Sequence, residues 1–270
     1  MIGPYELNSI YSGECSELMA ALPDNCIDLT VTSPPYDDLR DYEGYPFDFE
    51  PIAQQLYRIT KPGGVVVWVV ADATKNGSES GTSFKQALYF KDVGFNLHDT
   101  MIWNKGGFTA TGSLAVRYAS VFEYMIILSK GYPRVFNPIK DRPTINKGRK
   151  IQGTIRLKNN TFRKVSNNNN KKISAFSQRF NIWKINPIKT NTAKDHPASF
   201  PEGLARDHII SWSNPSDLVF DPMCGSGTTC KMAKQTGRRW LGFDISEKYC
   251  ELARKRVRVA QPPLFMEDNT

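Results

Sequence analysis

The sequence lacks the features of several special classes of protein. It contains no run of about 18 apolar residues, so we expect no membrane-spanning helix. Its first residues show no basic segment followed by an apolar stretch, so we expect no secretory signal peptide. The five cysteines are scattered and form no CxxC pair, which predicts neither a metal site nor a disulfide framework. We therefore expect a cytoplasmic protein in a reducing compartment, with no bound metal and no membrane association.

Acidic residues are scarce in one part of the chain. Between Tyr132 and Lys194 there are sixteen lysines and arginines and one acid, Asp141. The whole chain has a formal net charge of +8, so the remainder is mildly acidic. Such a basic segment is typical of a polyanion-binding protein, and a solvated lysine-rich loop is the alternative. The segment also has asparagine runs and little periodicity, which leaves ordered loops with short strands and partial disorder both open.

The rest of the chain alternates short apolar runs with helical patterns. This alternation predicts an α/β fold with a mostly parallel sheet. Ile52, Leu56 and Ile59 have helical spacing, and the glycines at 63 and 64 stop that helix. Another helix is expected from Ser246, a residue type that favours the N-cap. Strands are expected at 27–32, 65–70, 100–103, 122–128, 216–220 and 240–243.

The motif Thr32-Ser33-Pro34-Pro35-Tyr36 follows the first of these strands. In open α/β sheets, ligands bind beyond the carboxyl ends of the strands. Two successive prolines stiffen the backbone and remove two N–H donors. The Ser33 hydroxyl and the Pro34 carbonyl can then accept hydrogens from an amine while the Tyr36 ring stacks on a flat group. The motif predicts a site for a planar molecule bearing an NH₂ group, and a proline-rich turn that closes a strand is the alternative.

A glycine-rich turn from Asp221 to Thr228 follows a later strand, and Asp244 ends the next one. Glycines allow a close approach between backbone and ligand, and an acid at the next strand end can accept hydrogen bonds from ribose hydroxyls. Cys230 replaces the third glycine of a dinucleotide-binding motif, and no GxxxxGK[ST] motif for ATP occurs. The pattern therefore favours a ligand with a ribose and no pyrophosphate, such as S-adenosylmethionine.

Together the two motifs resemble those of the DNA amino-methyltransferases, which make N4-methylcytosine or N6-methyladenine. The order of parts resembles the β group of that family, in which the catalytic motif precedes a target-recognition region and the cofactor motif. The family's S/N/D-P-P-Y/F is matched by Ser33 to Tyr36. Its D-P-F-x-G-S-G-T is matched from Asp221 to Thr228, with Met223 in the place of phenylalanine. The resemblance covers roughly residues 8–130 and 192–258.

The resemblance implies a fold, a division of the chain and a set of site residues. The fold is a circularly permuted, Rossmann-like S-adenosylmethionine-dependent methyltransferase with a mostly parallel, seven-stranded sheet. The catalytic part is 1–131, a basic target-recognition insertion is 132–194, and the cofactor-binding part is 195–270. The catalytic residues are Ser33, Pro34, Pro35 and Tyr36. The residues implied for binding S-adenosyl-L-methionine are Glu14, Thr32, Ser33, Ala198, Phe200, Phe220, Asp221, Pro222, Cys224, Gly225, Gly227, Thr228, Asp244 and Ile245.

Double-stranded DNA is the partner that the resemblance and the basic insertion together imply. A companion restriction endonuclease is a second candidate partner, and no oligomeric state is predicted. We expect DNA contacts from basic side chains of the insertion, namely Lys147, Arg149, Lys150, Arg163, Lys164, Lys171 and Lys172.

The predicted reaction is methyl transfer to the N4 amine of a cytosine flipped out of the duplex. By family resemblance, serine at the first tetrapeptide position is more frequent among N4-cytosine enzymes, and aspartate is more frequent among N6-adenine enzymes. N6-adenine methylation is the alternative. No Pro-Cys dipeptide occurs, which disfavours carbon-5 methylation through a cysteine nucleophile. The remaining alternatives are an RNA or protein methyltransferase, a nicotinamide oxidoreductase and a catalytically inactive DNA-binding module.

Overall fold

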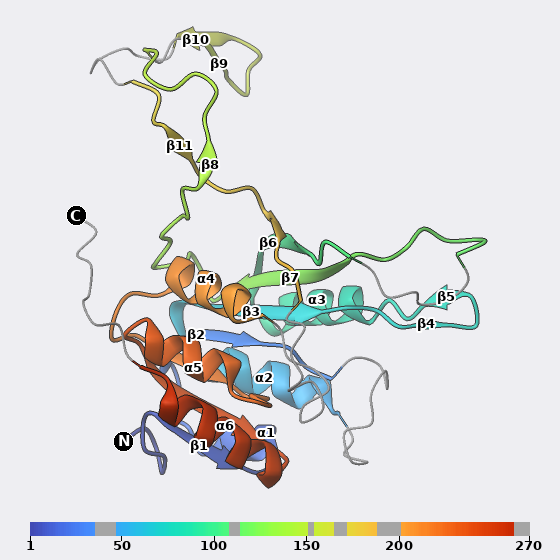
Figure 1. Cartoon of the computed structure of the whole chain (residues 1–270), viewed down its shortest axis with the longest axis vertical. Coiled ribbons are helices and arrows are strands. Elements are labelled where there is room, and N and C mark those ends of the chain that lie inside the picture. Colours follow the sequence, from blue (N-terminus) through green and yellow to red (C-terminus); the bar gives the residue numbers. More distant parts are fainter. Residues whose placement is uncertain (36–46, 108–113, 151–153, 165–171, 188–200, 262–270) are drawn as a thin grey trace. The chain divides into compact units, whose positions relative to one another are not determined.

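The structure is a computed structural model of the 270-residue chain. It describes residues 1–35, 47–107, 114–150, 154–164, 172–187 and 201–261. The chain forms two compact units, of which the larger combines residues 1–137 and 181–270 and the smaller is 138–180 (Figure 1). No helix in the described ranges is long and apolar enough to cross a membrane.

The larger unit is built on one mixed sheet (Figure 1). The first five strands in its spatial order run parallel, β7 is antiparallel to both of its neighbours, and β12 is parallel to β6. This arrangement confirms the expected α/β fold with a mostly parallel sheet. Among the described residues, the strand order is β1 (Ser9–Ser12), β14 (Arg239–Asp244), β13 (Leu218–Asp221), β2 (Ile27–Thr32), β3 (Thr60–Val70), β7 (Phe122–Ser129), β6 (Asn96–Asn104) and β12 (Ile182–Lys184).

This sheet has one strand more than the seven expected, because β12 pairs with the outer edge of β6. The Trp103 indole donates a hydrogen bond to the Ile185 carbonyl at 2.8 Å. The buried Trp183 ring stacks on His208, with 4.4 Å between ring centroids. Three residues are too few to show an alternating pattern, so this strand was not predicted from the sequence.

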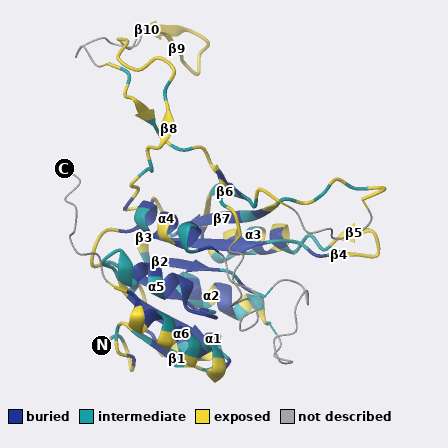
Figure 2. Cartoon of the chain, in the orientation of Figure 1, coloured by how far each residue is buried: buried dark blue, intermediate teal, exposed yellow. Residues whose placement is uncertain are grey.

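Six helices of the described chain pack in two rows. One row is formed by α1 (Cys15–Ala20), α2 (Phe49–Ile59) and α3 (Thr82–Val93), and the other by α4 (Glu202–Trp212), α5 (Thr228–Gln235) and α6 (Glu247–Val259). Every residue of β2 and the last seven of β3 are buried, as in a parallel sheet covered on both faces. Figure 2 shows this burial concentrated on the central strands.

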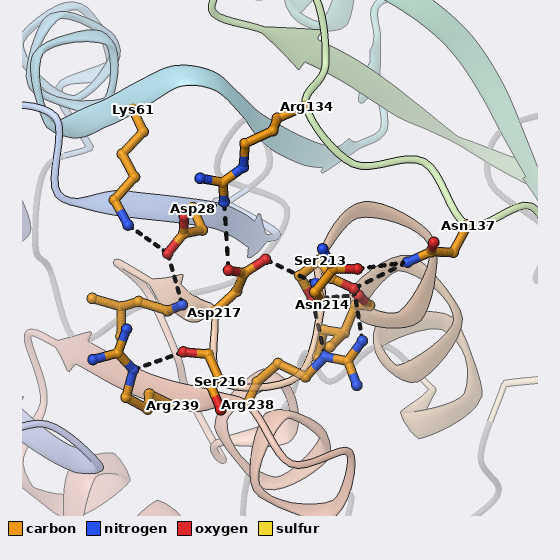
Figure 3. Close-up of polar contacts among 12 residues, drawn as sticks. Asp28, Lys61, Arg134, Asn137, Ser213, Asn214, Ser216, Asp217, Arg238 and Arg239 are labelled. Atoms are coloured by element: carbon orange, nitrogen blue, oxygen red, sulfur yellow. Dashed lines mark hydrogen bonds and ion pairs between the residues drawn. The ribbon is translucent and has the colours of Figure 1, made fainter. Parts of the chain in front are cut away.

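A buried carboxylate lies at the amino end of β2, opposite the end that carries the proline motif. Asp28 accepts a hydrogen bond from Lys61 Nζ at 2.8 Å (Figure 3). It also accepts hydrogen bonds from Arg134 Nη2 at 2.6 Å and from the Leu218 amide at 2.9 Å. Burial raises the pKa of Asp28, but these three donors outweigh it and hold the pKa below its ordinary value. The contacts join β2, β3, β13 and the segment after β7.

The smaller unit contains two short antiparallel pairs. One pair is β8 (Arg142–Pro143) with β11 (Phe176–Ser177), and the other is β9 (Thr154–Arg156) with β10 (Phe162–Lys164). Most of its described residues are exposed (Figure 2). In the larger unit, β4 (Thr74–Lys75) and β5 (Ser78–Glu79) form a further hairpin. The smaller unit covers less of the chain than the insertion expected at 132–194.

Candidate active site

The residues that the sequence singled out come together at one edge of the larger sheet. Strands β1, β14, β13 and β2 are consecutive and parallel, so their carboxyl ends lie side by side. These ends carry, in the same order, Glu14, Asp244, Asp221 and Thr32. Segments more than 180 residues apart in the sequence therefore meet at the sheet edge where α/β proteins bind ligands.

A buried hydrogen bond joins the two predicted motifs. Thr32 Oγ1 donates to Asp221 Oδ1 at 2.7 Å, and the Met223 amide donates to the same oxygen at 3.2 Å. Burial, together with the nearby charge of Asp244, raises the pKa of Asp221 to about 7, although the hydrogen bonds that the carboxylate accepts act in the opposite direction. The site thus contains a carboxyl group that titrates near neutral pH.

A second hydrogen bond holds the same two segments together. The hydroxyl of Thr229, in the first turn of α5, donates to the Val31 carbonyl at 3.0 Å. Thr229 is 1% exposed, so this bond is shielded from water. The residues predicted from the sequence to bind the cofactor include Thr228 but not Thr229. The signal in the sequence was that a second threonine, Thr229, directly follows Thr228 at the end of the glycine-rich turn.

The glycine-rich turn has the backbone conformation that its composition predicts. Gly225 and Gly227 have φ angles of 49° and 77°, which favour glycine. A Cβ atom on Gly227 would lie 2.8 Å from the Cβ of Ala253 in α6. The turn is therefore packed closely against a helix, and a side chain at this position would be strained and crowded.

Asp244 is held against this turn. Its Oδ2 accepts the Gly225 amide at 2.7 Å, and its Oδ1 accepts the Ser246 amide at 3.0 Å. Each carboxylate oxygen has a second lone pair, so the group can still accept hydrogen bonds from ligand hydroxyls. A buried acid of this kind suits a ribose.

Glu14 follows β1 and caps α1. Its carboxylate accepts the Glu17 amide at 2.8 Å and the Ser16 hydroxyl at 2.5 Å. Burial raises its pKa, but the hydrogen bonds from Ser16 and Glu17 outweigh this and lower the pKa below its ordinary value. The Gly13 amide donates to the Asp244 carbonyl at 2.9 Å, which places this strand end beside Asp244.

The predicted catalytic tetrapeptide begins directly after β2. Pro34 is buried, and Ser33 and Pro35 are half-buried. Tyr36 lies outside the described residues, as do Ala198, Phe200 and Lys171. The remaining predicted cofactor residues form two groups. Phe220, Asp221, Pro222, Cys224, Gly225, Gly227 and Thr228 are buried in and after β13, and Asp244 with half-buried Ile245 lies at the end of β14.

Two cysteines, Cys224 in the glycine-rich turn and Cys230 in α5, lie close to Gly242 of β14. Cys224 and Cys230 are buried, and a Cβ atom on Gly242 would lie 2.8 Å from Cys230 Sγ and 3.2 Å from Cys224 Sγ. The hydrogen bond with Cys230 and burial raise the pKa of the Cys224 thiol well above its ordinary value. Because the thiolate is the reactive form, Cys224 is an unsuitable nucleophile.

A cavity of about 530 Å³ lies elsewhere on the larger unit. It is lined by the first residues of β1, by Trp240 and by the basic residues Lys234, Arg238, Arg254 and Arg258. These positions are at the amino ends of β1 and β14, so this cavity is separate from the cluster of acids at the carboxyl ends.

The groups at the carboxyl ends fit S-adenosylmethionine. Asp244 offers acceptors for ribose hydroxyls, and Asp221, when ionised, offers a negative charge to a cationic ligand. The glycine-rich turn lacks the third glycine of a dinucleotide-binding motif, since Cys230 stands there, and no GxxxxGK[ST] motif for ATP occurs. A ligand with a ribose, a positive charge and no phosphate matches this set.

The comparisons with known proteins agree with this chemistry. The DNA methylase family model N6_N4_Mtase matches residues 27–255. The chain belongs to the N6/N4 DNA methylase family. The orphan methyltransferase M.BamHII of Bacillus amyloliquefaciens is 52% identical over 242 residues, which are 87% of this chain and 90% of that protein. The type II methyltransferase M.BglII of Bacillus subtilis is 26% identical, over 92% of this chain and 68% of its own length.

Solved structures of methyltransferases share the fold. The PvuII DNA methyltransferase (cytosine-N4-specific) has a TM-score of 0.68 at 22% identity, over 97% of this chain and 87% of that one. TTHA0409 from Thermus thermophilus, in complex with S-adenosyl-L-methionine, has a TM-score of 0.60 at 23% identity, over 92% and 94%. The predicted methyltransferase fold is confirmed, and the methyl donor of this DNA methyltransferase is S-adenosyl-L-methionine.

The residues predicted to bind DNA lie in the smaller unit. Lys147, Arg149, Lys150, Arg163 and Lys172 are exposed. Lys164 belongs to β10, and the backbones of Lys150 and Lys172 form an isolated antiparallel bridge. Exposure leaves these cations available to phosphates, and their role in DNA binding stays a prediction.

Proposed function

We propose that this enzyme transfers the methyl group of S-adenosylmethionine to the N4 amine of a cytosine within a specific sequence of double-stranded DNA. The observation that carries the proposal is the hydrogen bond between Thr32 and Asp221. It fixes the end of β2, and therefore the start of the Ser33-Pro34-Pro35-Tyr36 motif, to the cofactor turn. Amine acceptors and methyl donor are then brought to the same sheet edge.

The tetrapeptide provides what an exocyclic amine needs in order to react. The lone pair of such an amine is delocalised into the ring, which makes it a poor nucleophile. Hydrogen bonds to Ser33 Oγ and the Pro34 carbonyl draw the nitrogen towards tetrahedral geometry and place acceptors where positive charge develops. S-adenosylmethionine supplies the methyl group as a sulfonium, and much of the acceleration is orientation. The reaction needs neither a covalent intermediate nor a thiolate.

The target base must leave the duplex to reach this sheet edge. Base flipping costs a few kcal/mol, and stacking on the Tyr36 ring recovers about 1–3 kcal/mol. The basic insertion supplies the contacts that hold the duplex during this step. In this proposal Lys147, Arg149, Lys150, Arg163, Lys164, Lys171 and Lys172 bind phosphates, which position the protein without reading sequence.

Serine at the first tetrapeptide position favours cytosine over adenine. The PvuII enzyme, which shares the fold, is described as cytosine-N4-specific, and this supports the same choice here. A carboxylate at this position accepts an amine hydrogen more strongly than a hydroxyl does, but that difference alone does not select a base.

The test is to methylate duplex DNA with the purified enzyme, digest it to nucleosides and separate these by mass spectrometry. We expect N4-methylcytosine. N6-methyladenine would assign the enzyme to the other branch of the family, and 5-methylcytosine would contradict the non-covalent mechanism. Ser33→Ala should keep its affinity for S-adenosylmethionine and slow the transfer. A Ser33→Ala variant with full turnover would leave the Pro34 carbonyl as the acceptor.

A further inference from the structure

The smaller unit contains a tight ribbon formed by β9 and β10. The Leu157 amide donates to the Thr161 carbonyl at 2.8 Å, and the Asn160 amide donates to the Leu157 carbonyl at 3.0 Å. Asn160 has a φ of 62°, and Asn159 Oδ1 accepts the Thr161 hydroxyl at 2.7 Å. These bonds close a three-residue loop, 158–160, of the kind that joins two antiparallel strands. The ribbon therefore has a fixed register.

That register assigns the side chains to two faces. Residues paired across an antiparallel ribbon project to the same side, so Arg156 lies beside Phe162, and Ile155 lies beside Arg163 on the opposite side. Phe162 is 68% exposed, whereas Ile155 is 46% exposed and Leu157, on the same side as Ile155, is 37% exposed. The face of Arg156 and Phe162 therefore presents the more exposed apolar side chain.

The charge on this ribbon is uncompensated. Asp141, which is the sole acid in the sequence of the smaller unit, forms an ion pair with Arg179 at 2.5 Å. Among the described residues, neither Arg156 nor Arg163 has an acidic partner. Both arginines are exposed. An exposed ribbon with unpaired guanidinium groups is complementary to a polyanion.

We propose that the face of Arg156 and Phe162 reads base edges in the major groove of the DNA substrate, and that Arg163 on the other face supplies positive charge alone. The inference rests on the proposed function, and it assigns sequence specificity to particular residues. The major groove is about 12 Å wide and admits a two-stranded ribbon. An arginine there can donate two hydrogen bonds to O6 and N7 of guanine, and an apolar side chain can contact a thymine methyl group.

The geometry favours duplex DNA over duplex RNA as the partner. The major groove of A-form RNA is deep and narrow, so side chains cannot read it. A ribbon that presents an arginine and an aromatic ring on one flat face suits the wider groove of B-form DNA. Phosphate contacts elsewhere on the basic unit would hold the ribbon in place, because such contacts set register and orientation.

The experiment compares Arg156→Ala with Arg163→Ala, which remove the same charge from opposite faces of one ribbon. The methylated site is first identified by sequencing DNA treated with the wild-type enzyme. Binding is then measured by fluorescence anisotropy on a duplex with that site and on duplexes in which each base pair is replaced in turn. Both side chains are exposed, so neither variant should change the melting temperature.

We expect Arg156→Ala to lose discrimination by about tenfold to a hundredfold at one G·C pair. Arg156→Lys should lose the same discrimination while keeping the wild-type salt dependence. Arg163→Ala should lower the affinity for all duplexes by the same factor. It should also reduce the steepness of log affinity against log salt by about 0.9. Replacing the guanine by 7-deazaguanine removes its N7 acceptor in the major groove. This replacement should lower the affinity of the wild-type enzyme for the duplex and leave the affinity of Arg156→Ala unchanged.

Three results would overturn the inference. In the first, Arg156→Ala lowers the affinity for every duplex by the same factor, as is expected of Arg163→Ala, and the ribbon then contacts phosphates only. Arg156→Ala could bind all duplexes as the wild type does, which would remove the ribbon from the interface. A wild type indifferent to 7-deazaguanine would exclude reading in the major groove. A wild-type enzyme that methylates no DNA would instead contradict the proposed function, and the two failures are distinct.

Discussion

The hydroxyl of Thr32 and the carboxylate of Asp221 are 189 residues apart in the sequence and 2.7 Å apart in the fold. Both side chains are almost completely buried. Thr32 ends the strand that leads into the predicted catalytic tetrapeptide, and Asp221 begins the predicted cofactor turn. This buried bond joins the two motifs, so we expect Thr32 to position them through Asp221.

Thr32→Val should uncouple the two motifs, since valine keeps the shape of threonine and removes the donor. We expect a loss of about 1–2 kcal/mol in the free energy of unfolding. We also expect methyl transfer to slow by about tenfold or more in single-turnover measurements, because a small misplacement of reacting groups is costly. Thr32→Ser retains the hydroxyl and should restore the rate. A Thr32→Val enzyme with the wild-type rate would contradict the positioning role, whatever its stability.

The raised pKa of Asp221 predicts a pH dependence of stability. The ordinary value is 3.8, and the folded value is about 7. Between these values the folded chain binds a proton that the unfolded chain has released, so the free energy of unfolding falls as pH rises from about 4 to about 7. Above pH 7 this contribution is constant. Urea unfolding at several pH values should show the slope in the wild type and lose it in Asp221→Asn. Parallel curves for the two proteins would contradict the assignment.

Gly227 should tolerate no side chain. Gly227→Ala places a Cβ atom on a residue with a φ of 77° and 2.8 Å from the Cβ of Ala253. A left-handed backbone alone costs an alanine about 1–2 kcal/mol, and the steric conflict adds to that cost. We expect lower stability in urea unfolding and weaker binding of S-adenosylmethionine in titration calorimetry.

Gly203→Ala is the matched control for this change. Gly203 lies in α4, and an added Cβ atom would meet nothing within 4 Å. Alanine is the better helix former, so this variant should gain roughly 0.5–1 kcal/mol and bind the cofactor normally. If both variants behaved alike, the argument from the close packing of the turn would fail.

The sequence predicted those parts of the site that depend on local chemistry. The prolines after Ser33, the glycines after Asp221 and the acid at 244 each belong to a strand end, and the parallel direction of the strands brings these ends together. Local pattern also predicted α2 and α6, because helical spacing and an N-cap residue are readable over one or two turns.

Contacts between distant segments could not be predicted in the same way. Nothing near Thr32 indicates that its hydroxyl will meet Asp221, and nothing near Val31 indicates that its carbonyl will accept from Thr229. Both bonds depend on which strands become neighbours. The edge strand β12 was missed for a related reason, since three residues pair there because Trp103 and Trp183 pack in the core. Propensity over so short a segment cannot compete with tertiary contacts.

The buried carboxylate of Asp28 should stabilise the fold in a pH window different from that of Asp221. Its pKa is lowered in the folded chain, so its contribution is fully present above the ordinary value of 3.8 and is lost as pH falls through the folded value. Asp28→Asn removes the charge that faces Lys61 and Arg134, so Lys61 loses its ion pair at 2.8 Å and Arg134 keeps the longer contact with Asp217 at 3.4 Å. Since those two side chains are 31% and 52% exposed, we expect a loss of about 1–3 kcal/mol at pH 7, at the lower end of values for buried pairs.

The control is Asp24→Asn, which removes another carboxylate from an ion pair. Asp24 contacts Arg58 at 2.7 Å, but its side chain is 69% exposed, so its loss should change the free energy of unfolding by less than about 1 kcal/mol. Urea unfolding at pH 7 should therefore separate Asp28→Asn from Asp24→Asn, and the difference between Asp28→Asn and the wild type should shrink at acidic pH. Equal effects of the two substitutions at pH 7 would show that the buried cluster of Asp28, Lys61 and Arg134 contributes no more than a surface pair. A difference that persists in acid would contradict the lowered pKa of Asp28.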